Sequence, residues 1–330
     1  MDLNTRMISA PYSIPHKEKA ALYEEFLTRL TRFHQQNCPE YRRLLKALGH
    51  PEEGVFSPET TPMLPVSIFK DLDLKSVSDE AVFKTLTSSG TTGQRVSKIY
   101  LDAETSANQQ RVLYRIVSDF VGEKRLPFLV LDSKKVLRDR AMFSARGAGI
   151  LGFSIFASQT FYALDENMVL DLDGVRRFLD THGGGPVLLF GFTYMVWKKL
   201  AGDAVSPAEF KARVRKATGV GRVYDYYGMA EQTGCIYMEC PCGHLHASIW
   251  SDVIFRRPSD FGICEPGESG LIQVLSLLPR SYPGHSLLTE DMGVLLGEDD
   301  CPCGRLGKYF TVTGRAPRAE VRGCSDTYEG

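Results

Sequence analysis

One short loop constrains this chain more than any other segment. Residues 87–98 read Thr-Ser-Ser-Gly-Thr-Thr-Gly-Gln-Arg-Val-Ser-Lys. Glycines allow a tight backbone whose N–H groups approach phosphate oxygens, and Lys98 adds a cation nearby. The apolar segment before the loop (81–86) and the alternating segment after it (98–101) are typical of strands. The pattern predicts a phosphate-binding loop between two strands, without the spacing or the following helix of a P-loop. The candidate phosphate-binding residues are Ser88, Ser89, Gly90, Thr91, Thr92 and Gly93.

Apolar spacing predicts an α/β fold. Residues 16–48 carry apolar positions at helical spacing in two stretches separated by Pro39, which predicts an N-terminal helical layer. Strands and helices then alternate as in a βαβ sheet, with expected helices at 103–121, 170–182 and 194–200 and expected strands at 128–132, 187–190 and 221–225. From about residue 235, short strands and Gly/Pro turns predict a β-rich sub-domain.

The composition limits the class of protein. Hydrophobic residues make up 43% and charged residues 24% of the 330 residues, as in soluble globular proteins. The 39 basic and 40 acidic residues nearly balance, which argues against a nucleic-acid binder. No apolar run approaches the ~20 residues that a membrane span needs, and the N-terminus lacks a signal-peptide pattern. We therefore expect a cytoplasmic protein whose eight cysteines are thiols, metal ligands or nucleophiles rather than disulfides.

The loop resembles the phosphate loop of the adenylate-forming superfamily, which includes acyl-CoA ligases and luciferases. Those enzymes attack the α-phosphate of ATP with a carboxylate, which yields an acyl-adenylate and pyrophosphate. The segment Tyr226-Tyr-Gly-Met-Ala-Glu231 is similar to the Y-G-x-x-E motif of the superfamily. The resemblance implies that Tyr227 and Gly228 lie near adenine and that Glu231 helps to hold Mg²⁺, which prefers carboxylate and phosphate oxygens.

Two later segments extend the resemblance in the order that the superfamily shows. Thr289-Glu290-Asp291 resembles the T-G-D segment and Gly314-Arg315 the glycine–arginine pair, so Asp291 and Arg315 are implied to bind the ribose. A carboxylate can accept hydrogen bonds from both ribose hydroxyls. Glu290 stands where the family often has glycine, so the shape of this turn is open. Lys98 and the loop would stabilise the charge that develops at the α-phosphate.

Three more segments narrow the family. Residues 65–70 (Pro-Val-Ser-Ile-Phe-Lys), 144–147 (Ser-Ala-Arg-Gly) and 320–324 (Glu-Val-Arg-Gly-Cys) resemble the acyl-protein synthetase family, the ligase subunit of the bacterial luminescence fatty-acid reductase and its biosynthetic relatives. The resemblance implies that Cys324 accepts the acyl group as a thioester and passes it to a partner protein, and that the acid is a fatty acid. Nearby Arg318 and Arg322 would lower the pKa of this thiol. The alternative is an ordinary thiol at a frayed terminus.

The resemblance covers most of the chain and implies a single adenylation core over residues 1–330. Its expected parts are an N-terminal helical layer with its connection (1–85), an α/β nucleotide-binding part (86–234) and a β-rich part with the C-terminal tail (235–330). Ordinary superfamily members continue as a mobile lid domain, whereas only 15 residues follow Arg315, so we expect the lid to be absent.

Two other functions remain open at this stage. One is direct acyl transfer to coenzyme A, a carrier protein or an amine without a covalent enzyme intermediate. The other is an inactive nucleotide- or zinc-binding scaffold, which the missing lid favours.

Two similar Cys-Pro-Cys segments, here called hooks, are Cys240-Pro-Cys242 and Cys301-Pro-Cys303. Their thiols, with nearby histidines, are the kinds of ligand that form a tetrahedral Zn²⁺ site. Similar patterns hold a structural zinc in the phenylacetate-CoA ligase branch of the superfamily. The favoured ligands are Cys240, His246, Cys301 and Cys303, with Cys242 and His244 as substitutes. Four protein ligands leave no position for water, so the expected role is structural. The alternative is two turns with reduced thiols and no metal.

Overall fold

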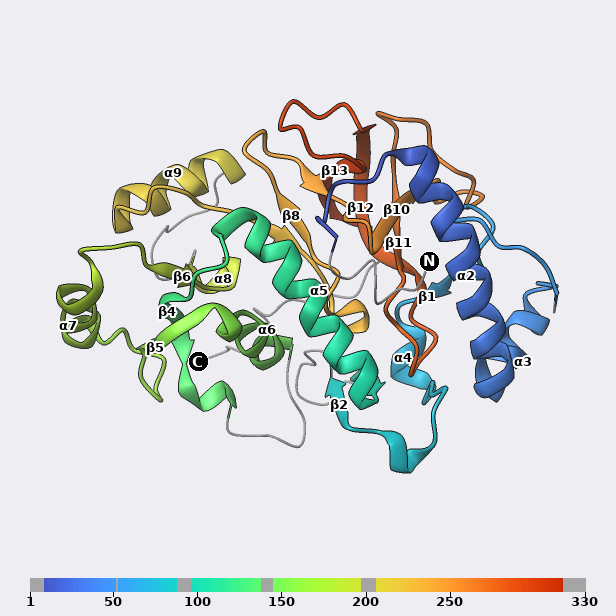
Figure 1. Cartoon of the computed structure of the whole chain (residues 1–330), viewed down its shortest axis with the longest axis horizontal. Coiled ribbons are helices and arrows are strands. Elements are labelled where there is room, and N and C mark those ends of the chain that lie inside the picture. The colour runs from blue at the N-terminus through green and yellow to red at the C-terminus, as the bar shows by residue number, and fades with distance from the viewer. Residues whose placement is uncertain (1–8, 52, 88–95, 138–144, 197–205, 317–330) are drawn as a thin grey trace. The chain divides into compact units, whose positions relative to one another are not determined.

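The computed structural model describes residues 9–51, 53–87, 96–137, 145–196 and 206–316 (Figure 1). Contacts between residues divide the chain into two units. The first unit contains the described residues up to 87 together with 96–121 and 225–316, and the second contains those of 122–224. The three-part division expected from the sequence stays a prediction.

The first unit is built on one mixed sheet. The strands in order are β10 (Ser251–Arg256), β11 (Ser269–Ser276), β12 (Ser286–Glu298), β13 (Lys308–Arg315), β9 (Leu245–His246), β8 (Tyr237–Glu239) and β7 (Tyr226–Tyr227). These pairs are antiparallel, and β1 (Leu64–Pro65) adds a parallel pair with β12. A separate antiparallel hairpin joins β2 (Lys84–Thr87) to β3 (Lys98–Leu101). The β-rich region expected after residue 235 is confirmed.

Helices α2 (His16–Asn37) and α3 (Pro39–Ala47) form the predicted N-terminal layer. The first unit also contains α4 (Ile68–Asp71), the predicted helix α5 (Ala103–Val121) and the 3₁₀ turns η1 (Asp79–Ala81) and η5 (Ala230–Gln232). Apolar residues recur on one face of α2, and Tyr23, Phe26 and Leu27 pack there against Ile254 and Leu275 of the sheet. This burial of an apolar stripe explains why the periodicity of residues 16–48 predicted the layer.

The second unit is a small βαβ arrangement. Its parallel sheet has the order β5 (Ala157–Leu164), β4 (Leu126–Ser133), β6 (Leu188–Phe190). Helices α6 (Ala145–Phe153), α7 (Leu172–His182), α8 (Thr193–Val196) and α9 (Pro207–Thr218) belong to it, with short 3₁₀ turns η2 (Lys134–Leu137) and η3 (Ser154–Phe156). The buried core includes Leu129, Leu131 and Phe178. The parallel strands confirm the predicted alternation of strands and helices.

Three details differ from the sequence prediction. The strand expected at 221–225 is wrong, because ladder pairing with β8 covers only Tyr226 and Tyr227. Strand β5 was not predicted, since it lies at the sheet edge and its exposed residues 158–160 are polar. Helix α9 was also not predicted, although Ser206 caps it through the N–H of Glu209 and Gly219 ends it in the left-handed conformation.

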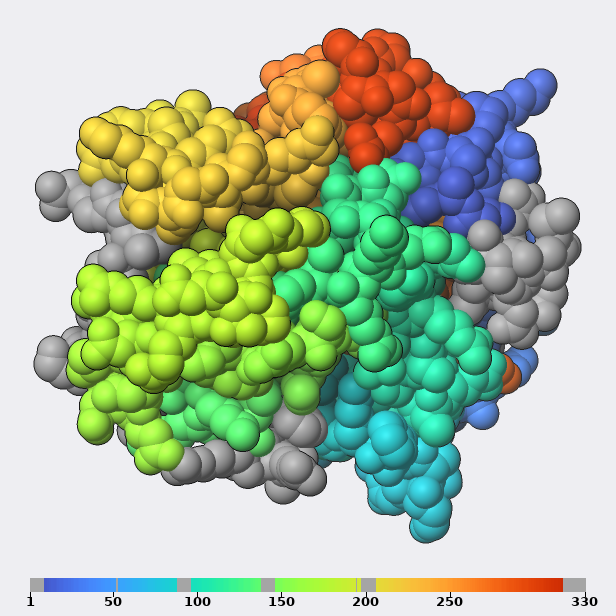
Figure 2. Space-filling view, turned by 60° about the vertical axis from the view of Figure 1, so that its left-hand side comes forward, coloured from blue at the N-terminus to red at the C-terminus, as the bar shows by residue number. Residues whose placement is uncertain are grey.

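The N-terminal segment and the segment that carries the second cysteine hook lie side by side within the first unit. Figure 2 shows them in blue and red, and the N–H of Leu306 donates to the carbonyl of Tyr12 at 3.1 Å. The carboxylate of buried Asp252 lies 3.1 Å from the ammonium group of Lys308 and 3.5 Å from that of Lys19. Burial opposes ionisation of Asp252, but the two lysines outweigh it and lower its pKa.

Among the described residues, no helix combines the length and apolarity needed to cross a bilayer.

Two buried histidines stack in the first unit. The rings of His34 in α2 and His285 before β12 have centroids 5.0 Å apart. Ser76 and the carbonyl of Pro279 lie 2.7 and 3.2 Å from the nitrogens of His34, and the hydroxyl of Thr31 lies 3.0 Å from His285. Burial, followed by the repulsion that a protonated His285 would exert, lowers the pKa of His34 well below its usual value. Burial lowers the pKa of His285 to about 3. Both rings are therefore neutral at pH 7.

We predict that this pair makes the folded protein acid-sensitive. The unfolded chain protonates both histidines near pH 6.5, whereas the folded chain does not, so unfolding takes up two protons below that pH. The free energy of unfolding is at its full value above about pH 6.5 and falls by up to about 3 kcal/mol per pH unit below it. Urea unfolding followed by circular dichroism between pH 7 and pH 5 measures this slope.

The matched control is the double variant His34→Asn/His285→Asn, which should show a shallower slope whatever its absolute stability. A wild-type stability that stays constant over the same pH range contradicts the prediction.

Candidate nucleotide site and metal centre

The pairing of β12 with β13 brings together residues that are far apart in the sequence. Asp291 and Arg315 are directly opposite in this ladder. The hydroxyl of Tyr227, from β7, donates to Oδ2 of Asp291 at 2.7 Å, and Nε of Arg315 lies 3.6 Å from Oδ1. Burial, and next the Asp291 carboxylate, raise the pKa of Tyr227, so its hydroxyl remains a donor. Three of the residues implied to bind the nucleoside therefore form one polar cluster.

Glu290 occupies the position where glycine was expected. Its carboxylate forms an ion pair with the guanidinium of Arg315 at 2.6 Å, and its carbonyl accepts a hydrogen bond from the N–H of Ala316 at 2.8 Å. Residues with positive φ do not include Glu290, and β12 runs through this position. A glycine is therefore not needed here, and the additional carboxylate orients the guanidinium of Arg315 beside Asp291.

Glu231 lies in the buried turn η5, which several long-range hydrogen bonds hold. Tyr282 donates to the carbonyl of Glu231 at 2.8 Å. The amide of Gln232 donates to the carbonyls of Val274 at 3.2 Å and Gly284 at 2.8 Å. These contacts fix the main chain at Glu231 and the side chain of Gln232. Glu231 itself is only 4% exposed.

Helix α5 holds the end of the same turn. The hydroxyl of Thr233 donates to Gln109 at 2.7 Å, and Gln109 in turn reaches the hydroxyl of Tyr282 at 3.5 Å. Gly234 has a φ of +90°, and a Cβ there would lie 2.7 Å from the backbone of Gln109. Sequence patterns did not reveal Gln109, Gly234 or Tyr282, because each acts through a contact distant in the sequence.

The segment predicted to bind phosphate follows one expected strand and precedes the other. Thr87 ends β2 and pairs with Lys98, which begins β3. Nζ of Lys98 lies 3.7 Å from Asp73, and both side chains are well exposed. The six candidate loop residues, Ser88, Ser89, Gly90, Thr91, Thr92 and Gly93, lie outside the described residues, as does Cys324. Their roles stay predictions.

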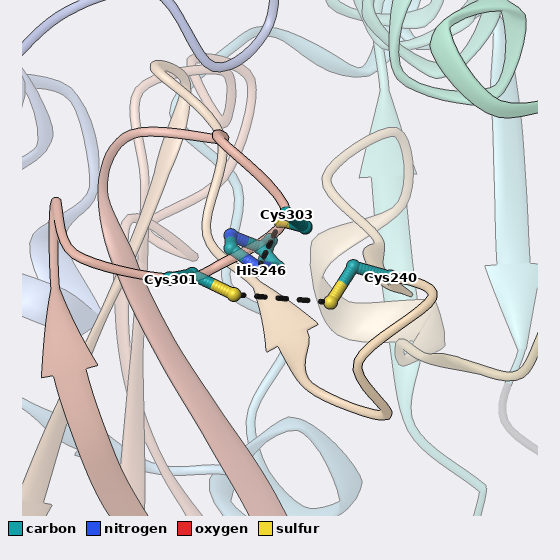
Figure 3. Close-up of side chains that lie close together, drawn as sticks. All are labelled: Cys240, His246, Cys301 and Cys303. Atoms are coloured by element: carbon teal, nitrogen blue, oxygen red, sulfur yellow. Dashed lines mark hydrogen bonds between the residues drawn. The ribbon is translucent and has the colours of Figure 1, made fainter.

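The four favoured hook residues converge at one point of the first unit (Figure 3). The ligand atoms of Cys240, His246, Cys301 and Cys303 all lie within 4.8 Å of one another. Sγ of Cys240 is 4.0 Å from that of Cys301, and Sγ of Cys303 is 3.4 Å from Nε2 of His246. The register of β9 against β13, which pairs His246 with Tyr309, brings the first hook beside the second.

These distances fit a tetrahedral metal site. Two thiolates bound to one Zn²⁺ at about 2.3 Å lie about 3.8 Å apart, and a thiolate and an imidazole about 3.5 Å apart. Burial, and next the charge of Arg305, lower the pKa of His246 to about 4, so the ring is neutral, as a ligand must be.

The thiols differ in their acidity. Burial raises the pKa of Cys240. It also raises the pKa of Cys301, to about 12. Burial also opposes ionisation of Cys303, but the N–H of Arg305 and the neighbouring thiols outweigh it and lower its pKa. A bound cation would favour the thiolate form of all three.

The two substitutes occupy different places. Nδ1 of His244 lies 3.3 Å from Sγ of Cys301, and its ring stacks on Tyr309 at 4.9 Å. Cys242 is exposed and lies outside the four-residue cluster. The remaining described cysteines, Cys38, Cys235 and Cys264, are buried singly.

Comparison with known protein families identifies the class of enzyme. The family described as acyl-protein synthetase, LuxE, matches residues 3–200 and 192–329. The chain belongs to the acyl-protein synthetase family. This acyl-protein synthetase is an adenylate-forming ligase, as its motifs predicted. No curated protein sequence matches it.

Solved structures share the fold of this acyl-protein synthetase. The open conformation of 2-hydroxyisobutyryl-CoA ligase, in complex with 2-HIB-AMP and CoA, gives a TM-score of 0.70 at 16% identity over 94% of this chain and 78% of that chain. The same ligase in its postadenylation state gives 0.66 at 16% identity over 92% and 69%. The ATP-bound RpMatB-BxBclM chimera B3 gives 0.50 at 16% identity over 72% and 49%. These likenesses confirm the predicted fold class.

We predict that Gly234→Ala separates η5 from α5. The new Cβ would collide with backbone of Gln109, so the Thr233–Gln109 hydrogen bond should break and Glu231 should shift. We expect a loss of roughly 3 kcal/mol in the free energy of unfolding, measured in urea. Gly49→Ala is the control, because Gly49 has a similar φ of +73° but open space around it. An equal effect of both substitutions contradicts the packing argument.

Proposed function

We propose that this acyl-protein synthetase activates a carboxylic acid with ATP as its adenylate. The observation that carries the proposal is the cluster of Tyr227, Asp291 and Arg315, which combines an aromatic ring, a carboxylate and a guanidinium. The Asp291 carboxylate can accept hydrogen bonds from both ribose hydroxyls, and the Tyr227 ring offers a surface on which adenine can stack. The ligase structures with a similar fold hold adenylates, 2-HIB-AMP and R3-HIB-AMP, which supports ATP as the co-substrate.

The residues have separate roles in the proposed reaction. A carboxylate oxygen of the acid attacks the α-phosphorus of ATP, and pyrophosphate leaves with the bond electrons. Lys98 and the loop at 88–93 stabilise the negative charge on the phosphates during this attack. Glu231, held by Tyr282 and Gln232, is the proposed Mg²⁺ ligand. Bound Mg²⁺ would supply further neutralisation of the phosphate charge.

The proposed second step moves the acyl group to the protein. The thiolate of Cys324 attacks the carbonyl carbon of the adenylate, AMP leaves, and a thioester forms. A partner protein then receives the acyl group, as the family name and the resemblance suggest. We propose a fatty acid as the class of substrate, on the resemblance to the luminescence fatty-acid reductase.

We further propose that the hooks bind one structural Zn²⁺ through Cys240, His246, Cys301 and Cys303. Three thiolates and one neutral imidazole form a donor set that zinc commonly takes. The site joins the β8–β9 turn to the β12–β13 connection, so zinc would fix the edge of the sheet that carries Tyr227.

The test of adenylation is ATP–pyrophosphate exchange across a panel of carboxylic acids from short to long and from aliphatic to aromatic. We expect exchange with one class of acid and a loss of about 100-fold or more in Asp291→Ala, because the ribose contact is removed. Asp260→Ala, at an exposed turn, should leave exchange unchanged. No exchange across the panel, with folded protein and Mg²⁺ present, would mean that a partner protein completes the site or that the chain is the inactive scaffold.

Substitution of Cys324 separates the two routes of acyl transfer. With radiolabelled acid and ATP, we expect the wild-type chain to carry acid-derived label that hydroxylamine releases. Cys324→Ser should lose this label and retain full pyrophosphate exchange, because only the second step needs the thiol. Label that persists in Cys324→Ser would overturn self-acylation at this residue. So would a wild-type chain that stays unlabelled while it transfers the acyl group rapidly to coenzyme A, a carrier protein or an amine.

Metal analysis of the purified chain tests the hooks. We expect about one zinc per chain in the wild type and in Cys242→Ser, and a loss of zinc in Cys301→Ser together with a lower thermal midpoint. Equal metal content in the two serine variants contradicts the assignment of the four ligands.

A further inference from the structure

A cavity of about 300 Å³ lies in the first unit, away from the residues assigned to ATP and zinc. It is bounded by α2, the first half of α5 and the segment 277–280 that follows β11. Tyr227, Glu231, Asp291 and Arg315 do not line it. Its volume is at the lower end of the range for small-molecule sites.

One part of the cavity wall is apolar. Phe26 and Leu30 of α2 face it, together with Leu277 and Leu278, and all four residues are at least nine-tenths buried. Such walls favour a ligand whose body is a short hydrocarbon chain.

The rim is cationic. Arg29 and Arg280 line it, with their guanidinium groups 4.3 Å from the ring centroid of Phe26 and 5.1 Å from that of Phe33. Glu104 lies 3.4 Å from Arg280, whereas Arg29 forms no ion pair within the part of the chain that the structure describes. The rim therefore has one positive charge in excess and offers a guanidinium to an anion.

A buried hydroxyl lines the same cavity. Thr105 is 1% exposed, and its Oγ1 has no hydrogen-bond partner among the described residues. The backbone N–H of Thr105 is used separately, by the Asp102 side chain that caps α5. Buried hydroxyl groups are normally hydrogen-bonded, so an unpartnered one in a cavity marks a place for a polar ligand atom.

We propose that this cavity binds a small carboxylate whose short apolar chain carries a hydroxyl or keto oxygen. The carboxylate pairs with Arg29 at the rim, the chain contacts the leucine and phenylalanine walls, and the chain oxygen bonds to Thr105. This is a second ligand site of the acyl-protein synthetase, independent of the adenylation residues.

Isothermal titration with three eight-carbon probes tests the proposal: 3-hydroxyoctanoate, octanoate and 1-octanol. We expect 3-hydroxyoctanoate to bind most tightly, about tenfold tighter than octanoate, because only it bonds to Thr105. Without the anionic group, 1-octanol should bind more weakly than either acid, and salt should weaken both acids.

Variants locate the binding. Thr105→Val should weaken 3-hydroxyoctanoate about tenfold, to the affinity of octanoate, and Thr105→Ser should preserve it. Arg29→Gln should weaken both acids several-fold, and Lys17→Gln, which removes an exposed charge from the same helix, should not. Hydrogen exchange should show ligand protection in the first half of α5 in the wild type, and Thr105→Val should need about tenfold more 3-hydroxyoctanoate to reach the same protection.

The outcome is distinguishable from binding at the adenylation residues. Thr105→Val and Arg29→Gln should leave pyrophosphate exchange unchanged, since neither residue belongs to that cluster. Saturable binding that these two substitutions leave unaltered, or no binding at millimolar concentrations, overturns the proposal.

Discussion

The antiparallel pairing of β12 with β13 is the constraint on which both candidate sites depend. At one end of this ladder Asp291 faces Arg315, and at the other end the strands pass into the loop that carries Cys301 and Cys303. Two irregularities in the ladder, between Met292 and Gly293 and between Leu295 and Gly297, shift its register along the way. Backbone hydrogen bonds of a single hairpin therefore position the proposed ribose-binding pair and two of the four proposed metal ligands.

The rest of the sheet completes both sites by adding short strands to β13. Strand β9 places His246 beside Tyr309, and β7 places the Tyr227 hydroxyl on Asp291. A buried ion-pair network also stabilises the sheet, because the Asp252 carboxylate pairs with both Lys308 of β13 and Lys19 of α2. Removing one partner would leave a buried charge uncompensated, which typically costs several kcal/mol.

Sequence patterns predicted the features that depend on the spacing and type of nearby residues. Helical spacing predicted α2 and α5, and the two C-P-C hooks with their histidines predicted a group of side chains that do lie together. Motif order indicated the family, and with it Tyr227, Asp291 and Arg315 as neighbours. Long-range contacts were not predictable in this way: nothing near Tyr282 or Gln109 in the sequence points to Glu231. Strand β5 escaped detection because an edge strand with exposed polar residues lacks the apolar signal of a buried one.

Transfer of an oxygen atom from the acid to AMP is the most direct test of the central claim, that this chain joins a carboxylate to the α-phosphate. The carboxylic acid is labelled with ¹⁸O in both oxygens, incubated with ATP and Mg²⁺, and trapped with hydroxylamine, which attacks the acyl carbon and releases AMP. Mass spectrometry of the nucleotide should show AMP that carries one ¹⁸O atom. Unlabelled AMP, or formation of ADP in its place, would contradict the account.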